Sequence, residues 1–356
     1  MTQTLVVGST EAYSGKSAVL LGVAQALQAR GVAIAYGKPL GACLNGACAV
    51  DSDDPDIAFI AETLHLSPEQ VLPTVLRLDI STLAQRLHNS DYGDITGQLA
   101  TYAQSTAGLT LVEGPSTLSE GLLFDLSLAQ MATRLDATVL LIVRYHSHTC
   151  VESVLAAKQQ LGERLQGVIL NDIPAAEWEL VTQQIVPFLA SQAIAVWGCL
   201  PANRLLRSIS VAELVHQLNA EVLCCADRLD LMVEEFAIGA MNVNSALKYF
   251  RRSQHKAVIT GGDRTDIQLA ALETSTHCLI LTGQIPPTEL IRSRAEELEV
   301  PILSVELDTL TTVERIERVF GQARLHEPAK VQCMQELLTQ HVDLSLLFSH
   351  LAMSVA

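Results

Sequence analysis

A run of small, hydroxyl-bearing and cationic residues near the N-terminus has the composition of a phosphate-binding loop. It reads Gly-Ser-Thr-Glu-Ala-Tyr-Ser-Gly-Lys-Ser over residues 8–17, between a predicted strand and a predicted helix. A helix start offers unpaired N–H groups and the positive end of its dipole to phosphate oxygens. Lys16 would add a mobile positive charge, and the Ser17 hydroxyl suits Mg²⁺. We therefore predict that ATP with Mg²⁺ binds through Thr10, Glu11, Ser14, Gly15, Lys16, Ser17 and Ala18.

The first glycine of this loop departs from the usual spacing. The standard motif places a glycine where this chain has Thr10, and the nearest upstream glycine is Gly8. The predicted loop is therefore longer than the standard one. The alternative interpretation is a strand-to-helix turn that contains a glycine and a chance Lys-Ser pair. The strand–loop–helix context favours nucleotide binding.

Further polar residues follow apolar runs elsewhere in the first half of the chain. Lys38 comes after one run, Glu113 ends another, and Asn171 follows a third. The carboxyl ends of parallel strands form the edge at which open α/β sheets bind ligands. Taken alone, Glu113 is a solvated strand end, Asn171 a turn residue, and the acidic run at 51–56 a solvated turn. Beside Lys16 and Ser17, a role for Glu113 in the site is favoured.

The sequence pattern around these residues predicts an α/β fold. Apolar runs alternate with helical patterns at residues 4–7, 32–36, 109–112, 137–143, 167–170 and 193–197. Such an alternation predicts a parallel sheet covered by helices on both faces. A second alternation, over 211–320, predicts a smaller α/β domain. The expected divisions are a nucleotide-binding domain, a second domain and a helical C-terminal tail, at 1–205, 206–324 and 325–356.

The order of these features resembles that of dethiobiotin synthetases and of related amidotransferases of cobalamin synthesis, over residues 1–205. The match consists of the loop length, Lys-Pro-Leu at 38–40, the acidic run at 51–54, Glu-Gly-Pro at 113–115, Asn171 and Leu-Pro at 200–201. The resemblance implies that Lys38 approaches substrate and phosphate and that Asn171 reads the adenine. It also implies catalytic roles for Lys16, Lys38 and Glu113, metal ligation by Ser17, Asp53 or Asp54, and Glu113, and nucleotide contacts from Asn171 and Pro201.

The second predicted domain resembles the DRTGG domain family. The match consists of Gly-Gly-Asp-Arg-Thr-Asp at 261–266, Leu-Thr-Gly at 281–283, Pro-Pro at 286–287 and Asp-Thr at 308–309, and it lacks the two glycines expected after the threonine. The resemblance implies self-association or pairing with nucleotide-sensing modules. An arginine beside a glycine-rich turn can bind phosphate or carboxylate, so Gly262, Asp263 and Arg264 are candidate ligand residues. An Arg–Asp pair that braces the turn is the equally weighted alternative.

The two domains in this order resemble the non-catalytic N-terminal part of long bacterial phosphate acetyltransferases. In that family the acetyltransferase domain follows, whereas this chain ends at Ala356, so acetyl transfer is not expected of it. The favoured function is regulation or sensing, by a protein that binds ATP and Mg²⁺ and forms a homodimer through its second domain. This function is compatible with a protein partner. The alternative is an ATP-dependent ligase for a carboxylate-bearing small molecule. The apolar residues 40–44 weaken that alternative, and a weak ATPase activity fits either function.

Charge and composition exclude several other classes of protein. Lys and Arg number 23 against 39 Asp and Glu, a formal charge of −16, which argues against nucleic-acid or anionic-membrane binding. We find no signal peptide and no apolar run long enough to cross a membrane, so we expect a cytoplasmic protein. The eight cysteines form no C-x-x-C pair. His146 and His148 are too few ligands for a metal site and indicate a polar loop near the ligand edge.

Overall fold

The computed structural model describes residues 3–42, 54–88, 95–103, 107–321 and 325–350. The chain divides into two compact units: unit 1 comprises residues 1–202 and 325–356, and unit 2 comprises residues 203–324. The chain therefore leaves unit 1, builds unit 2 and then returns. The C-terminal tail predicted from residue 325 onward belongs to unit 1. No helix in the described ranges is long and apolar enough to cross a membrane.

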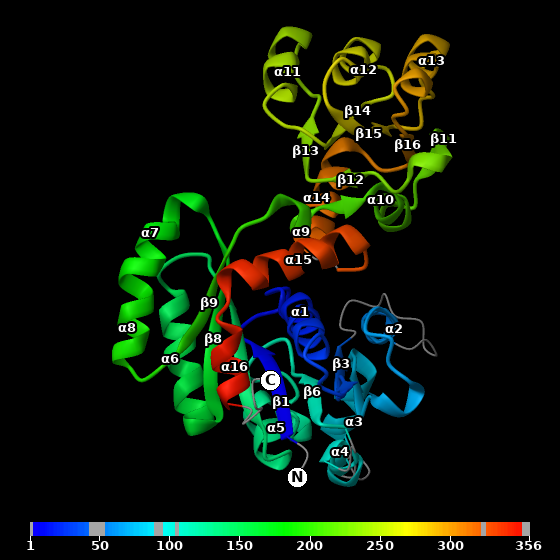
Figure 1. The fold of residues 1–356 in the computed structure, drawn as a ribbon. Helices are drawn as coiled ribbons and strands as arrows, with labels where there is room; N and C mark the ends of the chain where they lie inside the picture. Colours follow the sequence, from blue (N-terminus) through cyan, green and yellow to red (C-terminus); the bar gives the residue numbers. More distant parts are fainter. Residues whose placement is uncertain (1–2, 43–53, 89–94, 104–106, 322–324, 351–356) are drawn as a thin grey trace. The chain divides into compact units, whose positions relative to one another are not determined.

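Unit 1 is built on a parallel sheet of seven strands in the order β4-β2-β6-β1-β7-β8-β9 (Figure 1). Its strands are β1 (Gln3–Ser9), β2 (Ile34–Gly37), β4 (Val71–Leu72), β6 (Leu109–Glu113), β7 (Thr138–Arg144), β8 (Leu165–Ile173) and β9 (Val196–Pro201). Six of them overlap the predicted apolar runs, although β9 begins three residues later than its run. Two short strands, β3 (Leu40–Ala42) and β5 (Leu76–Leu78), pair in a separate parallel sheet. The predicted parallel α/β fold is confirmed.

Helices cover both faces of the large sheet, which is why its strands are almost entirely apolar. One face packs in a single core against α5 (Leu128–Arg134), α6 (Cys150–Leu161), and the helical stretch of α7 (Trp178–Leu180), a π-helical turn (Val181–Ile185) and α8 (Val186–Ser191). The other face is covered by α1 (Lys16–Gln28), α15 (Pro328–His341) and α16 (Leu344–His350). The remaining helices of unit 1 are α2 (Pro55–Thr63), α3 (Ile80–His88) and α4 (Ile95–Ala103). Leu99 and Tyr102 of α4 are buried in the same core as α5 and α6.

The contact between α1 and α15 is close because α1 has a glycine at its centre. A Cβ added at Gly22 would lie 2.1 Å from Cδ1 of Leu338. Leu338 and Met334 are both buried at this contact. At the end of α1, the guanidinium of Arg30 lies 3.6 Å from the centre of the Phe348 ring on α16. Residues that follow unit 2 in the sequence therefore hold the helix that begins at the predicted phosphate loop.

Unit 2 has a mixed sheet of five strands in the order β11-β16-β15-β14-β13. Its strands are β11 (Glu221–Cys224), which is antiparallel to its neighbour, and the parallel β13 (Glu235–Ile238), β14 (Lys256–Gly261), β15 (Thr276–Thr282) and β16 (Ile302–Val305). One face packs on α11 (Val243–Phe250), α12 (Thr265–Leu272) and α13 (Glu289–Glu297), and the other on α10 (Val211–Leu218) and α14 (Thr309–Gly321). The unit also contains α9 (Arg204–Arg207) and the short pair β10 (Ile209–Ser210) and β12 (Met232–Val233).

Candidate functional site

The predicted phosphate loop leaves the carboxyl end of β1, the central strand of the unit 1 sheet. The next strand in sequence, β2, lies two places away on one side, and β7 lies on the other side of β1. Strand order therefore reverses beside β1, and such a switch point is where open α/β sheets bind ligands. Gly15 precedes α1 with φ +85°, and a Cβ there would lie 2.4 Å from Nδ2 of Asn171. Only glycine suits this conformation and this space.

Three of the predicted site residues meet beneath the loop. Nζ of Lys16 donates to the carbonyl oxygen of Gly114 at 2.5 Å and lies 3.3 Å from Oε1 of Glu113. The Ser17 hydroxyl donates to the same carboxylate oxygen at 2.8 Å. Oε2 of Glu113 accepts from the hydroxyl of Tyr36 at 2.9 Å. Glu113 is 1% exposed and Lys16 8%, so the cation and the carboxylate face each other largely out of water.

Electrostatics keeps the Glu113 carboxylate ionised despite its burial. Burial by itself raises the pKa of Glu113, but the charges of Lys16 and Lys38 and the Ser17 hydrogen bond outweigh it, and the pKa lies below its usual value. For Tyr36, burial and the neighbouring Glu113 raise the pKa well above its usual value. The phenol therefore remains a neutral donor to an ionised acceptor.

Lys38 lies beside two carboxylates at the start of α2. Its Nζ is 2.6 Å from Oδ2 of Asp54 and 3.5 Å from Oδ2 of Asp56. Burial lowers the pKa of Lys38, but Glu113, Asp54 and Asp56 together outweigh it and raise that pKa. The partner of Asp54 in this structure is thus Lys38, and a magnesium role for Asp54 stays a prediction. Asp53 lies outside the described residues.

Asp54 also caps the start of α2, because its Oδ1 accepts from the backbone N–H of Asp56 at 3.0 Å, and Pro55 lies in the first turn. We expect Asp54→Ala to lower the free energy of unfolding by about 1 kcal/mol more than Asp54→Asn, because asparagine retains the capping oxygen. Urea unfolding of the two variants measures this difference. Because both variants lose the charge that faces Lys38, equal stabilities would contradict the capping role.

The remaining predicted contacts lie around the loop. Nδ2 of Asn171 donates to the carbonyl oxygen of Ser14 at 2.8 Å, so this side chain braces the loop. Glu11 pairs with Nε2 of His146 at 2.7 Å, which places the His146 loop beside the ligand edge. Thr10 and Ala18 are half-buried at either end of the loop. Pro201 ends β9 opposite Ile173 of β8, at the same edge of the sheet.

The loop contains a polar atom that the described protein groups leave without a partner. Ser14 is 2% exposed, and its hydroxyl oxygen has no hydrogen-bond partner among the described residues. Buried hydroxyls are rarely left in this state, so a ligand with oxygen atoms fits here. No group of three or more His, Cys, Asp or Glu side chains placed to hold a metal occurs in the described ranges. Mg²⁺ is commonly held by one or two carboxylates together with phosphate oxygens and water, and Ser17 and Glu113 fit that pattern.

Residues 3–210 match the protein family described as AAA domain, which is more than half of the chain. The chain belongs to this family. Residues 213–319 match the DRTGG domain family. The AAA domain match ends before α15, although α15 packs against its first helix, α1.

The chain is also similar to proteins named phosphate acetyltransferase. The one from Nitratidesulfovibrio vulgaris is 26% identical over 99% of this chain and 52% of its own length. The one from Synechocystis sp. has the same identity and the same coverage of both chains. The chain spans about half the length of these relatives, and the resemblance to their N-terminal region is confirmed. Among solved structures, the chain is similar to the CBS and DRTGG domains of Clostridium perfringens pyrophosphatase, complexed with diadenosine tetraphosphate. The match has 19% identity and a TM-score of 0.28, and it covers 43% of this chain and 72% of that one.

In the DRTGG domain, the predicted ligand residues bind neighbouring protein groups. Nε and Nη2 of Arg264 lie 3.1 and 3.3 Å from the carboxylate oxygens of Asp266, and Nη2 donates to the carbonyl oxygen of Met241 at 3.0 Å. The N–H of Gly262 donates to the carbonyl oxygen of Thr282. Asp263 lies beside Gly261 at the same turn. This is the Arg–Asp brace of the alternative interpretation, and a ligand role for these three residues stays a prediction.

Three residues at the site of the AAA domain lay outside the sequence prediction. Tyr36 is the penultimate residue of β2, next to β6, and its position near the carboxyl end of a strand was a usable signal. Asp56 belongs to the acidic run at 51–56, but the resemblance to dethiobiotin synthetases implied a role only for Asp53 or Asp54. His326 contacts Asp56 from 270 positions further along the chain, through a hydrogen bond of 2.8 Å. No local pattern in the sequence indicates such a distant contact.

Proposed function

We propose that this chain binds ATP with Mg²⁺ at the phosphate loop of its AAA domain and that it acts as a regulatory or sensing protein. The observation that carries the proposal is the convergence of Lys16, Ser17 and the ionised Glu113 beneath the loop. A cation, a hydroxyl and a carboxylate at a helix N-terminus are the groups that a magnesium nucleotide requires. The family match over residues 3–210 supports the same assignment.

Each residue at the phosphate loop has a separate role in the proposed binding of Mg-ATP. The loop around Gly15 and the start of α1 would receive the phosphates, with Lys16 as their positive counter-charge. Ser17 and Glu113 would hold Mg²⁺, which on binding offsets the negative charge of the phosphates. Asn171 orients the loop through Ser14. Gly114 and Glu113 hold Lys16 in this structure, so phosphates would compete with those groups for its charge.

The arrangement around Lys38 supports a regulatory function over a ligase. In a ligase that acts on a carboxylate-bearing substrate, Lys38 would offer its charge to that substrate. Here Asp54 and Asp56 already balance that charge. The chain also has a second unit with its own cores and a DRTGG match, which a simple ligase does not require.

Hydrogen exchange of the full chain, with and without Mg-ATP, tests the proposal. We expect slower exchange at the phosphate loop, accompanied by a change in unit 2, because a sensing protein must pass the binding event on to its other domain. A response confined to unit 1 would contradict the regulatory function but leave nucleotide binding intact. No response anywhere, together with no heat of binding, would contradict both.

We further propose that the chain forms a homodimer through unit 2. Four exposed apolar side chains of this unit support the proposal. Ile238 ends β13, Ile285 follows β15, and Leu290 and Leu310 lie in the first turns of α13 and α14, the helices that follow β15 and β16. Exposed apolar side chains that share an edge are typical of interaction surfaces, and twofold dimers are the commonest oligomers. We expect Leu290→Glu with Leu310→Glu to shift the mass measured by light scattering from dimer to monomer. The control is Leu87→Glu, on α3 of unit 1. Dissociation by the control alone would assign the dimer contact to unit 1.

A further inference from the structure

His326 is the first side chain to reach the candidate site after the chain returns from unit 2. The return segment, residues 325–350, begins at the end of unit 2 and contains α15 and α16. Nε2 of His326 lies 2.8 Å from Oδ1 of Asp56, and its ring lies 5.0 Å from the ring of Phe59 on α2. An ionised carboxylate only accepts hydrogen bonds, so His326 donates here.

This hydrogen bond fixes one of the two carboxylates that face Lys38. With Oδ1 of Asp56 bound to His326, its Oδ2 lies 3.5 Å from Nζ of Lys38. Lys38 in turn lies 2.6 Å from Asp54 and near enough to Glu113 for their charges to shift each other's pKa. The contacts therefore run from His326 to Asp56 and from Asp56 to Lys38. The charge of Lys38 then acts on Glu113, the carboxylate that binds Lys16 and Ser17.

The return segment also contacts the candidate site through α1. Helix α15 packs on α1, with Leu338 against Gly22, and the N-terminus of α1 forms part of the phosphate loop. The segment thus contacts both the helix that would receive the phosphates and the charged cluster beside the metal-binding residues. It joins these contacts directly to the chain that leaves unit 2.

We propose that His326 is a positioning residue for Lys38, acting through Asp56, and that it makes the nucleotide site depend on the position of the return segment. Only the second half of this inference, the dependence of the nucleotide site on the return segment, rests on the proposed nucleotide function. The first half concerns the protein without nucleotide. His326 touches no reacting group; it orients the Asp56 carboxylate, which holds the Lys38 amine.

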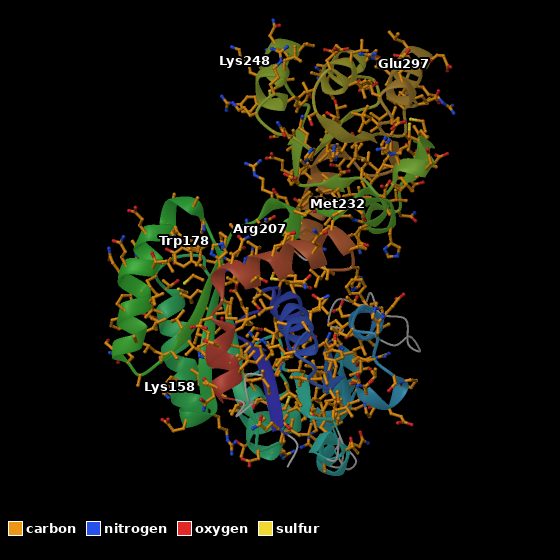
Figure 2. The ribbon with its side chains drawn as sticks, viewed as in Figure 1. Lys158, Trp178, Arg207, Met232, Lys248 and Glu297 are labelled. Atoms are coloured by element: carbon orange, nitrogen blue, oxygen red, sulfur yellow. The ribbon has the colours of Figure 1, made fainter. Side chains whose placement is uncertain are left out.

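Acetylation of Lys38 in the nucleotide-free protein tests the first half. Acetic anhydride reacts with the free amine, so its rate rises when an ion pair that holds the ammonium form is loosened. We expect His326→Ala to accelerate Lys38 acetylation roughly fivefold, as loss of a fixed carboxylate partner predicts. His326→Gln, which retains a donor near the position of Nε2, should react like the parent. Mass spectrometry measures the rate relative to Lys248, an exposed lysine of unit 2 (Figure 2).

A matched histidine in the same segment separates positioning from general loosening. His341 ends α15 and contacts the Trp178 ring at 5.5 Å, so His341→Ala removes a ring contact elsewhere in the segment. We expect it to leave the Lys38 rate unchanged. An unchanged Lys38 rate in His326→Ala, or an equal increase in His341→Ala, would overturn the positioning role.

The affinity for Mg-ATP tests the second half. We expect His326→Ala to weaken Mg-ATP binding about threefold, as a mutation within a coupled network does, with His326→Gln close to the parent. Faster Lys38 acetylation with unchanged affinity would overturn the link to the nucleotide site. If the parent protein binds no Mg-ATP, the proposed function fails together with this link, whereas the acetylation rates still decide whether His326 positions Lys38.

Discussion

Replacing Lys16 with alanine is expected to weaken Mg-ATP binding at least tenfold, or about 1.4 kcal/mol. The substitution removes the buried ammonium group that would bind the terminal phosphates. It also leaves the ionised Glu113 without the cation that lies 3.3 Å from it, so that phosphates would meet an unbalanced negative charge. Both changes act against an anionic ligand. Calorimetric titration of the parent and of the variant measures the difference.

Two controls keep this result specific to the phosphate loop. Lys158→Ala removes a lysine of α6 that binds Gly162 and Glu163, remote from the loop in sequence and contacts, and we expect it to bind Mg-ATP like the parent. Thermal unfolding without ligand shows whether Lys16→Ala remains folded. Equal affinity of the folded Lys16→Ala variant and the parent would remove the phosphate loop from the proposed site.

The parts of this fold that could be predicted from the sequence are those set by local patterns. The apolar runs that became β1, β6 and β7 are buried on both faces, so they stand out in the sequence without any periodicity. The two-residue β4 and the short edge strand β11, of which only Cys224 is fully buried, were not predicted. Lys16, Ser17 and Glu113 were predictable because a parallel sheet brings the ends of adjacent strands together.

The rest of the site depends on contacts that no local pattern encodes. The sequence shows Asp54 and Asp56 in an acidic run, but not that both face Lys38. His326 reaches Asp56 only because α15 returns to pack on α1, after about 120 residues of unit 2 have been built. The C-terminal tail at 325–356 was predicted to be helical, but the surface that its helix α15 covers depends on the small size of Gly22 on α1.

The second large effect is expected from Glu113→Gln, which replaces the buried carboxylate by an amide of the same shape. If the protein hydrolyses ATP, we expect Mg²⁺-dependent turnover to fall at least tenfold while the affinity for the nucleotide changes little, because the carboxylate would bind the metal and not the nucleotide. Glu163→Gln, at an exposed carboxylate, is the control for both measurements. Unchanged hydrolysis in Glu113→Gln would contradict the metal role, and a parent without hydrolysis would favour a purely binding function.

The same substitution has an effect on stability that does not require nucleotide. The pKa of Glu113 lies below its usual value in the folded protein, so the ionised carboxylate stabilises the fold above the pKa of the unfolded chain, about 4.3. This contribution is lost as the pH falls through the lower pKa of the folded state. At pH 7 we expect the parent to be more stable than Glu113→Gln by about 2 kcal/mol, the range of hydrogen bonds to a charged group. Urea unfolding at pH 7 and at successively lower pH should show this advantage shrinking below about pH 4. An advantage that is independent of pH would contradict a stabilising role for the charge of the Glu113 carboxylate.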